Sequence, residues 1–163
     1  MSGNAMSGRT VSDALIEPHW QDAFARVFDL CAARSGETVT VLAETRSRQL
    51  NLTLATAALG ELQLAHEIVT VPSKPASAGP IIRSTGASTA LTGESDAVAR
   101  LCESDLVIDL TVEGLMHAPE TAAILKSGTR IMTVSNEHPD ILARLVPQPA
   151  MKDVVRDAVA ACR

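Results

Sequence analysis

A glutamate and a histidine, Glu113 and His117, lie in a loop that follows the apolar segment 105–110. That segment is predicted to be a strand, and Pro119 opens a short helix just after the loop. In open α/β sheets, ligands bind beyond the carboxyl ends of the strands, which is where this loop would lie. A histidine there can donate or accept a proton, or hold a phenolate or carbonyl oxygen. His117 is therefore the first candidate catalytic residue; the alternative is a surface histidine at a helix start.

Polar side chains in three further predicted loops are expected at the same edge. They are Glu44, Arg46 and Arg48 after the first strand, Ser73 and Lys74 after the second, and Asn136, Glu137 and His138 after the fourth. His138 precedes a proline that opens a helix, and Asn136 or Glu137 could bond to amides there, so a structural cap is the favoured interpretation of this segment. His19 and His66 are also expected to be structural.

The sequence lacks the motifs typical of phosphate binding, of a serine nucleophile and of a complete metal site. The turn at residues 44–50 contains no glycine, which disfavours a phosphate-cradling loop. No Gly-x-Ser-x-Gly elbow is present, and no complete metal site is expected from the fragments around Glu113–His117 and Glu137–His138. The cysteines, Cys31, Cys102 and Cys162, have no paired zinc spacing, so we predict small apolar residues on buried helix faces.

The elements that position these residues alternate along the chain. Helices are predicted at about residues 17–33, 48–64, 93–103, 119–128, 139–145 and 151–162, and strands at 38–43, 67–71, 105–110 and 130–134. Alternation of this kind predicts an α/β fold: a three-layer, Rossmann-like open sheet of about four parallel strands with helices on both faces. The first helix carries an apolar stripe, formed by Trp20, Phe24, Val27, Phe28 and Cys31, that fits either a core or an interface.

Composition fits one soluble domain at residues 17–163, after a polar leader at 1–16 that we expect to be disordered. The leader is either native or, before Met6, partly an expression scar. Among the 163 residues, the net charge is −5 and the basic residues are scattered, which disfavours nucleic-acid binding. No apolar run is long enough to span a membrane, and a cytoplasmic location is expected.

Several segments are similar in order and spacing to one known family. They are residues 91–93, 104–109, 115–120, 124–131 and 141–147, of which Leu-x-His-x-Pro-Glu and Leu-Lys-x-Gly-Thr-Arg-Ile are the most specific. Together they resemble the 2,5-dihydroxypyridine 5,6-dioxygenases of nicotinic-acid breakdown. These enzymes are related to thermophilic metallo-aminopeptidases such as aminopeptidase T and leucyl aminopeptidase. The resemblance extends from about residue 27 to residue 162.

The resemblance implies a longer enzyme in which this α/β domain comes first and a metal-bearing domain second. In the family, Fe(II) is bound in the second domain and dioxygen opens the ring of a small heteroaromatic substrate. His117 would bind the substrate or exchange a proton with it, with Glu113, Leu115 and Met116 as further substrate-binding residues. No cofactor is expected within this chain, and a homo-oligomer is the expected assembly.

The turn at residues 44–50 departs from the dioxygenase pattern. Two alternatives therefore stay open. One is the N-terminal domain of an aminopeptidase-like metallohydrolase that uses divalent zinc, cobalt or manganese. The other is a non-catalytic scaffold or oligomerisation module. The chain itself could be an excised domain, a proteolytic remnant or a natural stand-alone module.

Overall fold

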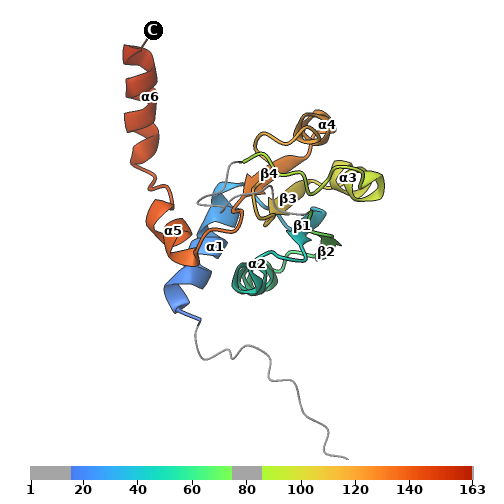
Figure 1. Cartoon of the computed structure of the whole chain (residues 1–163). Coiled ribbons are helices and arrows are strands. Elements are labelled where there is room, and N and C mark those ends of the chain that lie inside the picture. The colour runs from blue at the N-terminus through green and yellow to red at the C-terminus, as the bar shows by residue number, and fades with distance from the viewer. Residues whose placement is uncertain (1–15, 75–85, 163) are drawn as a thin grey trace, which may run out of the picture.

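A single parallel sheet of four strands forms the centre of the structure, a computed structural model that describes residues 16–74 and 86–162. The strands are β1 (Val39–Glu44), β2 (His66–Val71), β3 (Leu106–Asp109) and β4 (Arg130–Thr133), in the spatial order β2-β1-β3-β4. Helices cover both faces (Figure 1). The predicted α/β fold class is confirmed.

β2 is added to one side of β1, whereas β3 and then β4 are added to its other side, so β1 lies between β2 and β3. In the register of the sheet, Leu42 is paired with Val69 on one side and with Asp109 on the other. A ligand crevice is expected at the carboxyl ends of β1 and β3, where successive connections leave in opposite directions. The loops that carry the predicted polar residues leave the sheet at this edge.

One face of the sheet is covered by α1 (Pro18–Leu30), α2 (Gln49–Glu61) and α5 (Pro139–Leu145), with α1 in contact with both other helices. Their core contains Phe24 and Phe28, which are fully buried and meet edge to face. Alternate strand residues such as Val41 and Ile108 point into the same cluster.

The other face is covered by α3 (Ser95–Cys102) and α4 (Thr121–Lys126). Here the intervening strand residues, among them Leu42 and Val107, pack with Leu101 and Ile124 from the two helices. Both faces of the central strands are therefore buried, which explains why β1 and β3 are almost continuous apolar runs.

The last helix, α6 (Met151–Ala161), has no buried residue. Figure 1 shows that it projects from the rest of the molecule beyond α5. The sequence correctly predicted an amphipathic helix here, and the side chains of its apolar face are exposed.

Most predicted helices and strands are confirmed to within a few residues at their ends, although α4 begins at Thr121 rather than at Pro119. The apolar stripe of the first helix belongs to the core: Phe24 is fully buried, and Trp20 is partly buried against the same cluster. Ile16 packs there too; residues 1–15 of the predicted leader lie outside the described residues.

The prediction of buried cysteines is wrong for Cys162, which is exposed at the end of α6. Cys31 and Cys102 are partly buried against the core clusters, and burial raises the pKa of the Cys31 thiol. No helix among the described residues is long and apolar enough to cross a membrane.

Candidate functional site at the carboxyl edge of the sheet

Hydrogen bonds join the loops that follow β1, β2, β3 and β4. The Arg46 amide donates to Ser73 Oγ at 3.0 Å, and the Arg48 amide donates to Asn136 Oδ1 at 2.7 Å. Across the switch point, the Val112 amide donates to Glu44 Oε1 at 3.0 Å. The predicted convergence of these loops is therefore confirmed.

The loop that carries His117 is built on a buried carboxylate, Asp109, at the end of β3. Its Oδ1 accepts from the Thr111 amide at 2.9 Å and from Thr111 Oγ1 at 2.6 Å, and its Oδ2 accepts from the Leu115 amide at 2.7 Å. Burial raises the pKa of Asp109, although the hydrogen bonds from Thr111 and Leu115 oppose this shift. The buried Asp109 carboxylate therefore holds the backbone of the loop in place.

A second support for His117 comes from the segment that begins at Gly86. The Gly86 amide donates to the Glu113 carbonyl at 2.6 Å, and the His117 amide donates in turn to the Gly86 carbonyl. Two residues on, the Ser88 amide donates to the Gly114 carbonyl at 2.9 Å. The His117 loop is therefore held from the side as well as from below.

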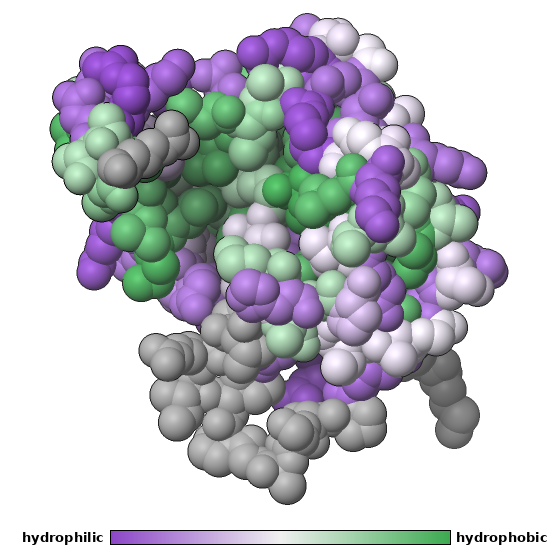
Figure 2. All heavy atoms as spheres, turned by 90° about the horizontal axis from the view of Figure 1, so that it is seen from above, coloured by the Kyte–Doolittle hydropathy of each residue, from purple (hydrophilic) through white to green (hydrophobic). Residues whose placement is uncertain are grey.

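An apolar hollow of about 340 Å³ lies beside this loop. It is lined by Gly86, Met116, Thr133, Val134, Ser135, Glu137, Ile141, Leu142 and Leu145. Ser135, at the end of β4, has a left-handed backbone with φ of 53°, a conformation that non-glycine residues seldom adopt away from functional or turn positions. Seen from above, the molecule has a hollowed area lined with hydrophobic residues on this face (Figure 2).

The four predicted substrate-binding residues take different positions. Met116, 66% exposed, lines the hollow. His117 is exposed and is not among the lining residues, but its ring lies near Gly86, which is one of them. Glu113 is half-buried in the same loop. Leu115 is fully buried and packs in the core beneath α3 and α4, so its side chain supports the loop from inside.

The remaining histidines have structural contacts. His138 is the N-cap of α5, and its Nδ1 accepts from the Asp140 amide at 3.3 Å, whereas Asn136 bonds to the start of α2 instead of capping α5. Among the described groups, the capping role predicted for Asn136 or Glu137 is thus met by His138 itself. His19 contacts Asp140, and His66 contacts the Leu64 carbonyl at 3.1 Å.

Three residues that shape this edge were not predicted from the sequence. Asp109 and Gly86 hold the His117 loop, and Asn51 on α2 donates to the Glu137 carbonyl at 2.9 Å. The role of Asp109 could have been predicted, because it ends an apolar strand and a buried carboxylate must be stabilised by hydrogen-bond donors. Asn51 is likewise a fully buried amide within a helix of leucine and alanine.

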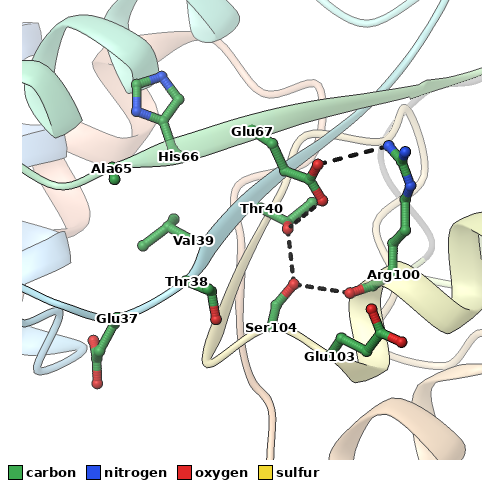
Figure 3. A pocket seen from close by; sticks show the side chains of 10 residues that line it. All are labelled: Glu37, Thr38, Val39, Thr40, Ala65, His66, Glu67, Arg100, Glu103 and Ser104. Atoms are coloured by element: carbon green, nitrogen blue, oxygen red, sulfur yellow. Dashed lines mark hydrogen bonds and ion pairs between the residues drawn. The ribbon is translucent and has the colours of Figure 1, made fainter.

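A different hollow, of about 390 Å³, lies at the opposite, amino edge of the sheet (Figure 3). Its polar groups are largely paired with one another: Thr40 Oγ1 and Ser104 Oγ are 2.7 Å apart, and Ser104 Oγ donates to the Arg100 carbonyl at 3.0 Å. An Arg100 guanidinium nitrogen also lies 3.6 Å from Glu67 Oε2. The carboxyl edge is the stronger candidate because its loops converge from four strands.

Residues 19–163 match the NicX family, described as 2,5-dihydroxypyridine 5,6-dioxygenase. The chain belongs to this family. It is 33% identical, over 126 residues, to the 2,5-dihydroxypyridine 5,6-dioxygenase of Pseudomonas putida KT2440, a match that covers 76% of this chain and 35% of that protein. The structure of the 2,5-dihydroxypyridine dioxygenase from Pseudomonas putida KT2440 matches with a TM-score of 0.70 at 31% identity.

The structural match covers 86% of this NicX-family chain but only 39% of the relative. The chain thus spans little more than a third of the length of the relatives that it matches. The family resemblance predicted from the short motifs is confirmed, and the family match extends through α5 and α6.

Proposed function

We propose that this chain is the N-terminal substrate-pocket and assembly domain of a 2,5-dihydroxypyridine 5,6-dioxygenase-like Fe(II) enzyme, which opens an aromatic ring with dioxygen. One observation carries the proposal: the backbone of His117 is bonded to Gly86, which lines an apolar hollow at the carboxyl edge of the sheet, in a chain of the NicX family. The assignment of the substrate class rests on the family.

The hollow suits a small planar ring. Its volume of about 340 Å³ lies at the lower end of the range for small-molecule pockets, and most of its lining is apolar. Met116, Leu142 and Leu145 would pack against the faces of a ring, while Ser135 and Glu137 offer polar groups to its substituents. A dihydroxypyridine has the matching pattern of an apolar ring with polar groups at its edge.

His117 would act on a substituent of the ring. Its backbone is anchored to Gly86, and the residue is exposed. A histidine can hold a hydroxyl or phenolate oxygen and exchange a proton with it. We assign His117 the binding and protonation of a substrate oxygen.

The described residues do not fit the Fe(II) that the family implies. Among residues 16–74 and 86–162, no group of three or more histidine, cysteine, aspartate or glutamate side chains could hold a metal ion. We therefore place iron binding outside these residues and derive no step through the metal. The contribution of this chain is to bind and orient the substrate.

Binding of the substrate can be tested on the chain itself. We expect 2,5-dihydroxypyridine to shift NMR signals of residues 86–88, 113–117 and 133–137, and His117→Ala to weaken binding by about tenfold, as loss of a hydrogen bond of about 1.4 kcal/mol would. His66→Ala, at the amino edge, is the matched control and should bind normally. Shifts confined to the amino edge, or equal binding by both variants, would contradict the proposed site.

A test of the reaction class requires an enzyme of the length typical of the family that contains this domain. There, His117→Ala should lower oxygen uptake with 2,5-dihydroxypyridine and leave the iron content unchanged; a loss of iron would refute the assigned role. The aminopeptidase-like hydrolase remains the alternative proposal. Cleavage of an amide substrate under anaerobic conditions, without oxygen uptake on the dihydroxypyridine, would favour that alternative.

A further inference from the structure

A charged residue belongs to the wall of the hollow at the carboxyl edge. Among the described residues that line this hollow, Glu137 carries the charge, and the others are Gly86, apolar residues and the hydroxyl-bearing Thr133 and Ser135. An ionised carboxylate accepts hydrogen bonds and donates none. A ligand in the hollow therefore meets a negative group on this side that can only accept.

The backbone between β4 and α5 is held by the first turn of α2 and its N-cap. Asn51 Nδ2 donates to the Glu137 carbonyl at 2.9 Å and to the Ser135 carbonyl at 3.4 Å. Arg48, the N-cap of α2, donates through its amide to Oδ1 of Asn136 at 2.7 Å and through its Nε to the carbonyl of the same residue at 3.4 Å. The carbonyls of three consecutive residues thus accept from α2 or its cap, and the backbone is restricted to one path.

That path contains a strained residue. The backbone of Ser135 is left-handed, with φ of 53°, a conformation that persists in a serine only where surrounding contacts impose it. The amides of Val134 and Ser135 both donate to the Asp109 carbonyl, at 2.9 Å and 3.1 Å. Ser135 is therefore held by β3 through its amide and by Asn51 through its carbonyl, and the place of Glu137, two residues later, follows from this turn.

The two ends of the Asn51 amide differ in their contacts. Asn51 is fully buried, and its Oδ1 has no hydrogen-bond partner among the described residues. Turning the amide over would place Oδ1 against two carbonyl oxygens, so the present orientation is the favourable one. A buried acceptor without a donor is destabilising and offsets much of the gain from the bonds of Nδ2. We therefore expect this asparagine to determine the path of the backbone more than the stability of the fold.

We propose that Asn51 positions Glu137, and that Glu137 selects the charge of the ring that enters the hollow. A ring with a hydroxyl or N–H group towards Glu137 would donate a charge-assisted hydrogen bond to the carboxylate. A ring with a carboxylate there would meet like charge, and apolar walls strengthen that repulsion by excluding water. Glu137 is then a specificity-determining residue and Asn51 a positioning residue. The identity of the ring rests on the proposed function, whereas the exclusion of negatively charged substituents goes beyond it.

Two rings that differ in one substituent test the selection. They are 2,5-dihydroxypyridine and 2-hydroxypyridine-5-carboxylate, titrated into the 163-residue chain and followed by the NMR signals of residues 133–137. We expect the wild type to bind the dihydroxypyridine about tenfold more tightly, with a preference that weakens as salt screens the two carboxylates. Glu137→Gln should remove most of this preference, mainly by binding the carboxylate ring more tightly. Glu103→Gln, which changes an exposed glutamate at the amino edge, is the matched control and should leave the preference unchanged.

Asn51→Leu tests the positioning, because leucine has the branched shape of asparagine but no donor. We expect the free energy of unfolding to stay close to that of the wild type, while the backbone coupling constants of Ser135 depart from left-handed values and the preference between the two rings is lost. The double variant Asn51→Leu/Glu137→Gln should discriminate no less than Glu137→Gln alone, since Asn51 acts through Glu137. Thr53→Leu, on the exposed side of α2, should change neither the coupling constants nor the preference.

Three results would each overturn the proposal: equal binding of both rings by the wild type, a preference that survives in Glu137→Gln, and unchanged coupling constants of Ser135 in Asn51→Leu. Failure of the proposed function has a different appearance. The wild type then binds neither ring at residues 133–137, which removes the selection as well, whereas the coupling constants of Ser135 still decide the positioning. An Asn51→Leu variant that does not fold would contradict the positioning role, and Glu137→Gln would still decide the selection.

Discussion

Gly86 lies so close to His117 that a Cβ added to the glycine would stand 3.3 Å from Cδ2 of the histidine ring and 3.2 Å from the Cβ of Met116. The backbone at Gly86 is also left-handed, with φ of 71°. The two residues are linked by the hydrogen bond from the His117 amide to the Gly86 carbonyl. The position of the proposed acid–base group is thus set by a residue that has no side chain.

Replacement of this glycine should disturb His117 specifically. We expect Gly86→Ala to lower the free energy of unfolding by about 1–2 kcal/mol through backbone strain, and to shift the NMR signals of the His117 ring. Gly128→Ala is the matched control: φ there is 100°, but a Cβ would meet nothing within 4 Å. If the two variants leave the His117 ring signals equally unchanged, the close packing of Gly86 on His117 does not determine its position.

Asp109→Asn should loosen the loop from below. One carboxylate oxygen accepts two hydrogen bonds from Thr111 and the other accepts one from the Leu115 amide, so an asparagine NH₂ must face at least one donor. An unpaired buried donor costs about 1–3 kcal/mol, and we expect a loss of stability of that size. Hydrogen exchange should show weaker protection of the Leu115 amide.

Asp105→Asn is the control for that variant. Asp105 precedes the other end of β3, where its Oδ2 accepts from the Thr38 amide and hydroxyl, both at 2.8 Å. Because this carboxylate is exposed to water, its replacement should cost less and leave the Leu115 amide protected. Unchanged protection of Leu115 in Asp109→Asn would show that the buried carboxylate does not hold the His117 loop.

The same pair of aspartates should give opposite pH dependences. Burial raises the pKa of Asp109 above the ordinary value of 3.8. Between 3.8 and the raised pKa, the folded state therefore binds more protons than the unfolded state. The contribution of Asp109 to the free energy of unfolding falls as the pH rises through this range. Hydrogen bonds from Thr38 lower the pKa of Asp105, so its contribution is present above 3.8 and is lost as the pH falls through the lowered value.

Urea denaturation of the wild type and both variants at several pH values measures how the contribution of each aspartate to the free energy of unfolding depends on pH. The stability difference between wild type and Asp109→Asn should shrink as the pH rises above 3.8, and the difference between wild type and Asp105→Asn should grow as the pH rises out of the acid range. Differences that run in the same direction for both aspartates would refute the prediction for Asp109.

Sequence patterns predicted the sheet and its loops because both depend on local signals. The aliphatic runs of β1 and β3 and the helical spacing of Phe24 and Phe28 determine elements and faces directly. Placing His117 at the carboxyl edge followed from the rule for parallel sheets. These inferences need no knowledge of which distant residues meet.

Contacts between distant segments could not be predicted in the same way. Gly86 and His117 are 31 residues apart, and no periodicity links a glycine in an irregular segment to a loop on another part of the chain. Likewise, the amphipathic pattern of α6 predicted a helix with one apolar face, but a pattern does not show what covers that face, and Val154 and Val155 are exposed in the structure.

A contact between α1 and α5 should be visible through the single tryptophan of the chain. Trp20 Nε1 donates to Asp140 Oδ1 at 2.6 Å, and His19 Nε2 lies 3.3 Å from the same oxygen. Both contacts lower the pKa of Asp140, with the Trp20 hydrogen bond as the larger cause. Because α5 contributes Ile141 and Leu142 to the hollow, this contact fixes one wall of the candidate site.

Asp140→Ala should therefore shift the emission maximum of Trp20 and lower the urea midpoint of unfolding. In wild type, the same emission should change as the pH falls through the lowered pKa of Asp140, because protonation weakens the acceptor for the indole N–H. Asp22→Ala, an exposed carboxylate on α1, should change neither quantity. An emission maximum that is unchanged in Asp140→Ala and constant across the acid range would show that the indole is not held by this carboxylate in solution.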